Sequence, residues 1–505
     1  MSKNIEDIRQ LEAPVEVIPN RSEKHSEAPA PGGWTSLQKN AFRILAIYFV
    51  LLCIPSYSTF YTHLLNLQFA KITYHDFQHV VAFWPPQLYL IETEEGVFGF
   101  LNYINLILLL VVSIILGLVW GLFDKRNTNF PRIYYWVSVL VRYRLAFGMV
   151  GWGMKKAFPM QMVYPTVGML NTSFIDMAEK KLYWSHVGVS FGYTVFLGFA
   201  EIIPGLLLLH RKTASLGGAL AAVVCFNIVL ANHAYDAGVA VPAAYFTLLG
   251  LFVVAGDFPR IWDLLVREKD TTINRYYPLY NAKEANQRLA VKSIGIFTFV
   301  PLTAFMWGYG FFNGNNYNIP STAGLRGVKG YYHVESFEVN GKTLPYNPSD
   351  SIRWHDAIFE DWSTLSYKTN RTALVDRMIG YSPLRVKGDK KNSTLNQVNT
   401  QDSDALFKKQ LNRDLGVTRW EVGGMAGDRR YFFYEADTVK QELYLQNKNK
   451  NHQDERQLLH YQFTGQNEIT LNGLNEFRDS IRVVLKKADK RYPLVEGRQS
   501  AISTF

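Results

Sequence analysis

Long apolar runs occupy most of residues 42–312, whereas charged and alternating stretches occupy the rest of the chain. A helix needs roughly 20 mostly apolar residues to cross about 30 Å of hydrocarbon. Seven segments meet this requirement: 42–62, 99–122, 134–154, 184–210, 215–233, 238–256 and 293–312. The sequence therefore predicts a membrane α-helical bundle of about seven transmembrane helices.

After Pro320 the apolar positions recur every second residue, which is the period of a half-buried strand. The stretch YYHVESFEVNGKTL alternates and then turns at Asn340-Gly341, a favoured hairpin dipeptide. Similar stretches follow, and a helix is expected at about 403–413. Short strands separated by turns predict that residues 313–505 form an all-β domain, either an antiparallel sandwich or a small barrel.

The N-terminal residues 1–41 are expected to form a disordered cytoplasmic tail, because residues 1–38 are polar and rich in proline and show no signal-peptide pattern. The chain has 2 cysteines, Cys53 and Cys225, and both lie in apolar runs. The β-domain therefore has no disulfide framework, and an iron–sulfur cluster lacks the four thiolates it needs.

The distribution of basic residues sets the predicted orientation. The net charge is +10, but much of the basic excess flanks apolar segments, so we exclude nucleic acid as a partner and infer contact with the lipid bilayer. Basic loops at 123–133, 211–214 and 257–292 alternate with an acidic loop at 63–98. This pattern predicts a cytoplasmic N-terminus and a periplasmic β-domain in a bacterial inner membrane. The loop 155–183 disagrees, because it carries Lys155, Lys156, Lys180 and Lys181 on the predicted outer side.

Arg144 and Glu201 are the most informative charges within the predicted helices. Each lies about nine or ten residues from the inner end of its helix, which is roughly 14–15 Å deep at 1.5 Å per residue. Opposite charges at matched depth on consecutive helices predict a buried pair. Such a pair either pins two helices together or forms a polar site for a quinone headgroup or a proton.

Two further groups are weaker candidates. The first group lies toward the outer surface and consists of Asn232, His233, Asp236, His186 and Lys155. An imidazole beside carboxylate and amide groups would relay protons or bind a polar headgroup. The alternative is that these side chains only cap helix ends. In the 63–98 loop, HDFQH places His75 and His79 on one helix face. Two ligands do not complete a metal site, so a solvated or interfacial helix is favoured there.

The stretch RLAFGMVGWGMKKAFPMQM, from Arg144 to Met162, resembles the opening of DoxX-like membrane proteins. The match falls on Arg144, Gly148, Gly153 and Lys155 or Lys156, and it continues through EIIPGLLLL from Glu201 and RKTASLGGALAAVV. The resemblance covers roughly residues 138–256 and implies a four-helix core. Some relatives are linked to thiosulfate:quinone oxidoreductase or to respiratory-chain roles, which makes a quinone the implied cofactor. Together with the β-domain, the chain resembles large DoxX-type proteins of Bacteroidetes-like bacteria.

Two functions remain open at this point. The first is a redox-associated membrane protein that binds a quinone- or lipid-like ligand at Arg144–Glu201 or near His233. The alternative is a membrane-anchored scaffold for envelope assembly, whose β-domain binds a membrane or periplasmic protein. A transporter is disfavoured because no inverted repeat is evident. No Ser or Cys stands in a recognisable catalytic setting, so whether the protein is an enzyme is left open.

Overall fold

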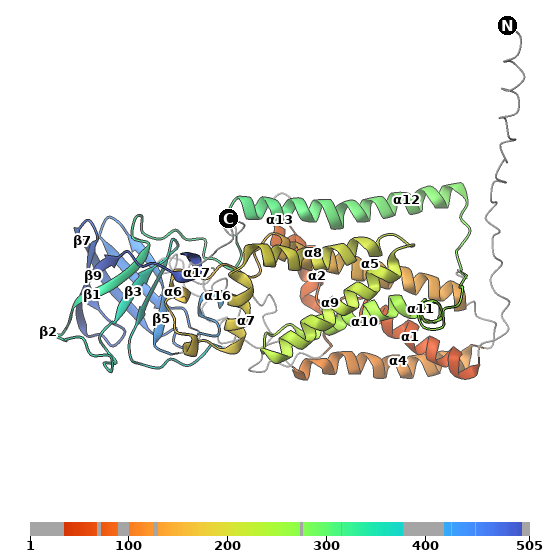
Figure 1. Ribbon diagram of the computed structural model, residues 1–505, viewed down its shortest axis with the longest axis horizontal. Helices are drawn as coiled ribbons and strands as arrows, with labels where there is room; N and C mark the ends of the chain where they lie inside the picture. Colours follow the sequence, from red (N-terminus) through yellow and green to blue (C-terminus); the bar gives the residue numbers. More distant parts are fainter. Residues whose placement is uncertain are drawn as a thin grey trace, which may run out of the picture.

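The computed structural model describes residues 35–67, 72–88, 100–124, 130–272, 276–314, 316–376, 419–425, 427–449 and 451–496. A helical part and a β part lie end to end along the long axis of the molecule (Figure 1). The helix expected at about 403–413 lies outside the described residues, as does most of the expected N-terminal tail.

The helical part contains a series of long helices and several short connecting ones. They are α1 (Ser36–Leu52), α2 (Ser58–Leu65), α3 (Tyr74–Val81), η2 (Phe100–Tyr103), α4 (Ile104–Phe123), α5 (Phe130–Ala157), α6 (Val167–Leu170), η3 (Phe174–Asp176), α7 (Glu179–Gly188), α8 (Phe191–Leu208), α9 (Ala214–Ala234), α10 (Ala240–Ala255), α11 (Phe258–Leu265), α12 (Ala282–Phe297), η4 (Thr298–Leu302) and α13 (Thr303–Phe312).

Within the described residues, four helices are long and apolar enough to cross a membrane: Phe100–Phe123, Phe191–Leu208, Ala214–Ala234 and Ala282–Phe312. The pair α10 and α11 is bent by 69° and adds a fifth if it is one span. Two predicted spans fall outside this set. Helix α1 has only 17 residues, and α5 has 28 residues but includes Arg142 and Arg144. A total of seven spans stays a prediction.

Three element boundaries differ from the prediction, each for a local reason. Helix α1 begins at Ser36, inside the expected tail, because Thr35 and Gln38 form a capping box. The predicted helix 184–210 is broken before Phe191, where the Ser190 side chain accepts a hydrogen bond from the Tyr193 amide. The last helix begins at Ala282 and not near residue 293, because Asn281 and Glu284 form a capping box, and it continues through a π-turn at Thr298–Leu302.

Helices α5 and α8 run antiparallel and approach each other closely. A Cβ atom added to Gly198 would lie 2.3 Å from the backbone nitrogen of Ala157. A Cβ added to Gly205 would lie 2.9 Å from the carbonyl oxygen of Ala146. Glycines at these positions let the two backbones approach closely, as small residues do between membrane helices.

Replacing Gly198 by alanine is therefore expected to destabilise the helical part by about 1–3 kcal/mol, the usual cost of overpacking. Gly192 lies in the same helix with nothing within 4 Å of its added Cβ, so G192A is a matched control that keeps or raises stability. Thermal unfolding in detergent compares the two variants. Equal melting temperatures would contradict the close approach.

The β part is a closed barrel. Its strands are β1 (Gly330–Val339), β2 (Lys342–Thr343), β3 (Asp356–Phe359), β4 (Thr364–Lys368), β5 (Arg429–Asp437), β6 (Glu442–Asn447), β7 (Arg456–Gly465), β8 (Glu468–Leu474) and β9 (Ser480–Ala488). Consecutive strands pair antiparallel in the order β2-β1-β3-β4-β5-β6-β7-β8-β9, and β1 also pairs with β9. Eight strands thus close on themselves and β2 only extends the β1 hairpin, so the barrel alternative is correct and the sandwich is not.

Alternation along the strands fills the barrel interior. In β9, Ile481, Val483 and Leu485 are buried while their neighbours Arg482 and Lys486 point outward and are exposed. The Asn340-Gly341 turn between β1 and β2 has φ values of 50° and 76°, as a two-residue hairpin turn requires. The hairpin prediction is therefore confirmed.

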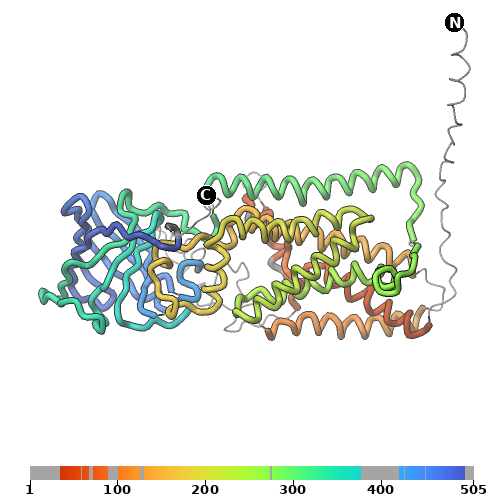
Figure 2. Tube along the Cα trace, in the orientation of Figure 1, coloured from red at the N-terminus to blue at the C-terminus, as the bar shows by residue number. Residues whose placement is uncertain are grey.

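The segment between α5 and α8 docks on the barrel, as Figure 2 shows where the yellow tube meets the blue one. The Ala178 amide donates to the Gly424 carbonyl at 2.8 Å. Lys181 is fully buried, and its Nζ donates to the carbonyl of Trp420. Burial lowers the pKa of Lys181 to about 7. Lys181 therefore serves contact between the helical part and the barrel, whereas Lys155 and Lys156 belong to the last turn of α5.

Candidate functional site

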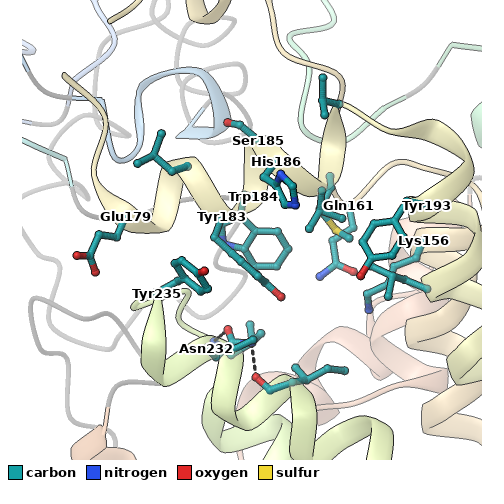
Figure 3. Close-up of a pocket in the computed structure, with 18 of the residues that line it drawn as sticks. Lys156, Gln161, Glu179, Tyr183, Trp184, Ser185, His186, Tyr193, Asn232 and Tyr235 are labelled. Atoms are coloured by element: carbon teal, nitrogen blue, oxygen red, sulfur yellow. Dashed lines mark hydrogen bonds between the residues drawn. The ribbon is translucent and has the colours of Figure 1, made fainter. Parts of the chain in front are cut away.

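A cavity of about 1340 Å³ lies where the helical part meets the barrel, between α7, α8 and α9 (Figure 3). Its walls are mainly apolar and aromatic. The segment before α7 contributes Met162 and Met169, and the helices contribute Trp184, Phe196, Leu197, Val223, Val224 and Ile228. The barrel side adds Leu494 from α17 (Pro493–Glu496). Ligand sites are typically apolar with a few placed polar groups, so the polar groups of this cavity decide what it can hold.

The cavity has a narrow continuation of about 50 Å³ that reaches into the bundle. Lys156, Gln161 and Glu201 line both spaces and so mark the junction between them. The continuation itself is lined by aromatic, aliphatic and sulfur-containing side chains, including Met149, Trp152, Cys225, Pro242 and Phe246. The inner end of the cavity is thus a polar spot within apolar surroundings.

Lys156 and Glu201 form an ion pair at this inner end. Lys156 Nζ donates to Glu201 Oε1 at 2.8 Å and to Oε2 at 3.0 Å. The two side chains are only 12% and 5% exposed. Lys156 comes from the last turn of α5 and Glu201 from the middle of α8, so the pair joins the two helices that also meet at Gly198.

The predicted pair between Arg144 and Glu201 is wrong. Arg144 Nη2 donates to the Phe83 carbonyl at 2.6 Å, and its guanidinium lies 3.7 Å from the centre of the Phe83 ring. Because α5 and α8 run antiparallel, later residues of α8 face earlier residues of α5. Gly205, one turn after Glu201, faces Ala146, so Glu201 lies beside a part of α5 that follows Arg144. Arg144 lies twelve residues before Lys156 on α5, roughly 18 Å along the helix.

The second predicted group divides between two places. Asn232 lines the cavity, but its side chain is used within the chain: Oδ1 accepts from the Val239 amide at 2.9 Å and Nδ2 donates to the Ile228 carbonyl at 2.7 Å. His186 also lines the cavity and is exposed. Asn232 therefore shows the capping role that was one of the alternatives.

The other members of that group lie apart from this cavity's lining. His233 Nε2 lies 3.0 Å from the Tyr103 hydroxyl, and the two rings stack at 5.8 Å. Asp236 is exposed in the turn after α9, with φ of 48°. Lys155 is buried against the rings of Trp152 and Tyr317, at 4.7 and 5.0 Å. The structure does not bring these residues together into one polar relay.

Only one of the two weak metal candidates has its side chain within the described residues. His79 lies in α3 with its ring 5.3 Å from that of His63, and the side chain of His75 lies outside the described part. No group of three or more His, Cys, Asp or Glu side chains within the described ranges is arranged to hold a metal ion. Helix α3 begins with a Thr73–Asp76 capping box, which gives its acidic residue a local structural role.

Comparison with known proteins adds little about function. No protein-family model and no solved structure matches this chain. The chain is 43% identical over 56 residues to the uncharacterized protein YwoB of Bacillus subtilis (strain 168). The similar segment covers 11% of this chain and 36% of YwoB, so the chain spans about a third of that protein's length. The resemblance to DoxX-like proteins stays a prediction.

Proposed function

We propose that this protein is a DoxX-like, redox-associated membrane protein that binds a quinone- or lipid-like amphiphile in the cavity between α7, α8 and α9. The polar head of the ligand lies at the Lys156–Glu201 pair, and its apolar tail lies along α8 and α9. The helical part spans a bacterial inner membrane seven times, with the N-terminus in the cytoplasm and the barrel in the periplasm.

The observation that carries this proposal is a buried ion pair at the inner end of an apolar-walled cavity. Ionisable groups within membrane helices are costly and are usually kept for function or pairing. A pair that only joined two helices would not need a cavity of about 1340 Å³ beside it. That volume exceeds the roughly 300–1,000 Å³ of sites for drug-sized molecules, and it suits an amphiphile with a tail.

The redox assignment rests on the resemblance. Glu201 stands at a position that carries the likeness to DoxX-like proteins, and the lysine of that likeness is Lys155 or Lys156. A bound quinone would supply reversible uptake of two electrons and two protons. In this proposal Lys156, which also pairs with Glu201, donates a hydrogen bond to a carbonyl oxygen of such a ring.

The test is extraction of the purified protein. We expect gentle purification in detergent, followed by mass spectrometry of extracted lipids, to recover one quinone or one other defined amphiphile at about one molecule per chain. The visible and ultraviolet spectrum of the same sample checks for the quinone chromophore. Recovery of bulk phospholipid alone would contradict the proposal.

A second role is supported by the barrel. A separate cavity of about 640 Å³ lies beside β1, β3 and β4 and is lined by polar side chains, among them His333, Arg353, His355, Asp356 and Lys368. Such a surface favours the alternative in which the β-domain binds a membrane or periplasmic protein and the helices are an anchor. The extraction experiment separates the two, because an anchor would retain only bulk phospholipid.

A further inference from the structure

Helix α12 lies along the outer edge of the bundle (Figure 1), and two contacts fix which of its faces is turned toward α5. Near the start of α12, Arg288 Nη2 donates to the Tyr135 hydroxyl at 3.3 Å. Further along the same continuous helix, the Phe299 ring stacks on the Phe147 ring at 4.2 Å. Lys292 lies one turn after Arg288 on the same face. It therefore falls between these two contacts, on the side of α12 that is turned toward α5.

Arg142 of α5 adds a third cation at this contact. Along α5 it lies between Tyr135 and Phe147, the two residues that touch the last helix. Its guanidinium lies 5.1 Å from the centre of the Tyr143 ring. It is also near enough for its charge to act on the Tyr135 hydroxyl, as the charge of Arg288 does. The two helices thus bring three cations to one place.

These cations are not balanced by acidic side chains. Within the described part of the chain, no ion pair joins Arg142, Arg288 or Lys292 to a carboxylate. Glu284 lies one turn before Arg288, but its carboxylate accepts from the Asn281 amide at 3.0 Å as part of a capping box. It offsets one of the three positive charges at most. The remaining charge favours an anionic group bound from outside the chain.

The two cations of α12 lie at the polar end of a long apolar helix. The helix Ala282–Phe312 has 31 residues, so it is about 46 Å long at 1.5 Å per residue and exceeds the roughly 30 Å of a bilayer's hydrocarbon core. Its apolar part begins at about residue 293, which places the preceding turns at the level of the lipid head groups. Next to the cations, the side chains of Leu289 and Ile294 are 63% and 66% exposed and offer an apolar surface to acyl chains.

We propose, on the basis of the membrane placement given above, that α5 and α12 bind the phosphate of an anionic phospholipid in the inner leaflet. Arg142, Arg288 and Lys292 neutralise the phosphate, and the acyl chains lie along the exposed apolar side chains of α12. Basic residues gathered between helices on the cytoplasmic side attract anionic head groups in this way. The site is separate from the cavity between α7, α8 and α9, because α12 starts at the end of the bundle that lies away from the barrel.

The test titrates the full-length protein in detergent with phosphatidylglycerol and with phosphatidylcholine of the same acyl chains. Native mass spectrometry counts the lipids retained. The wild-type protein is expected to retain phosphatidylglycerol about tenfold better, because only this lipid carries a net negative charge. The R288Q/K292Q variant should retain both lipids equally, whereas R288K/K292R, which keeps the charges, should keep the preference. Inorganic phosphate should not displace the lipid; if it does, the site takes a free anion and the lipid assignment is wrong.

The matched control is R267Q/K269Q, which removes two positive charges from the loop after α11, on the same predicted side of the membrane. It should keep the wild-type preference. Loss of the preference in this control, or its persistence in R288Q/K292Q, would overturn the inference.

A further variant, K156M/E201L, tests whether the site is independent of the proposed function. It removes the ion pair at the cavity and should still prefer phosphatidylglycerol. If it lost that preference, the lipid counted would be the one in the cavity, and no second site would exist. A wild-type protein that retains phosphatidylglycerol but yields no defined amphiphile on extraction would contradict the proposed function and leave this inference standing.

Discussion

Replacing Glu201 by leucine is expected to destabilise the helical part by about 3–5 kcal/mol, the usual cost of removing one partner of a buried ion pair. The cause is the ammonium of Lys156, whose side chain is only 12% exposed and would be left without its carboxylate. Unfolding followed by circular dichroism in mixed detergent measures the loss.

The double variant K156M/E201L separates structure from function. Two apolar side chains of similar size often replace a buried ion pair at little or no loss of stability. We expect the double variant to regain most of the stability lost by E201L and yet to yield no bound amphiphile on extraction. A stable double variant that still retained the ligand would show that the pair only joins α5 to α8.

The chain offers a matched control in a second buried ion pair. Arg43 of α1 and Asp124, which follows α4, lie 2.6 Å apart with side chains 8% and 6% exposed, and neither lines the cavity. The D124L variant should lose stability as E201L does, but it should keep the extracted ligand. Loss of the ligand from both variants would mean that any destabilisation of the helical bundle abolishes ligand binding, so that the effect of E201L would not be specific to the cavity.

Helices and strands were predictable where a single pattern of apolar positions decides them. The run from Ile104 to Phe123 is apolar on nearly all sides, which is typical of a transmembrane helix. The alternation of apolar and polar residues in β9 is typical of a strand with one buried face. Closure of the barrel was not predictable, because it depends on pairing between β1 and β9. Val339 pairs with Ile481, far along the chain, and nothing local in either strand selects that partner.

The candidate site was predicted in part. Glu201 was identified as a charge within an apolar helix, but Arg144 was wrongly predicted as its partner. The error arose because the depth of each residue in its helix was counted from the predicted helix ends. Helix α5 continues to Ala157, so Lys156 lies in the helix and not in an outer loop. Gln161 gave no signal, since a single polar residue in a connecting segment has no periodicity to mark it.

Raising the pH from about 5 to about 8 is expected to weaken the contact between the barrel and the helical part through Glu360. This carboxylate is 2% exposed and accepts from the Gly168 and Val167 amides, at 2.7 and 3.2 Å. Burial, followed by the nearby charge of Glu421, raises the pKa of Glu360 from 4.5 to about 7, although the two amides oppose the shift.

The sign follows from proton binding. Between the unfolded pKa of 4.5 and the folded pKa of about 7, the folded protein binds the Glu360 proton more tightly than the unfolded chain does. Stability from this group is therefore greatest below the lower value, falls as pH rises between the two, and then levels off. The total change is about 3 kcal/mol, and hydrogen exchange at the Val167 and Gly168 amides, corrected for the intrinsic pH dependence, measures it.

The E360Q variant should flatten this pH dependence, because its amide stays neutral while its carbonyl oxygen still accepts one of the two backbone N–H groups. Above about pH 7 the backbone amide that keeps this oxygen as its acceptor should be better protected than in the wild type. An exposed control, E335Q on the barrel wall, should keep the wild-type slope. If E360Q kept that slope as well, the titrating group would not be Glu360.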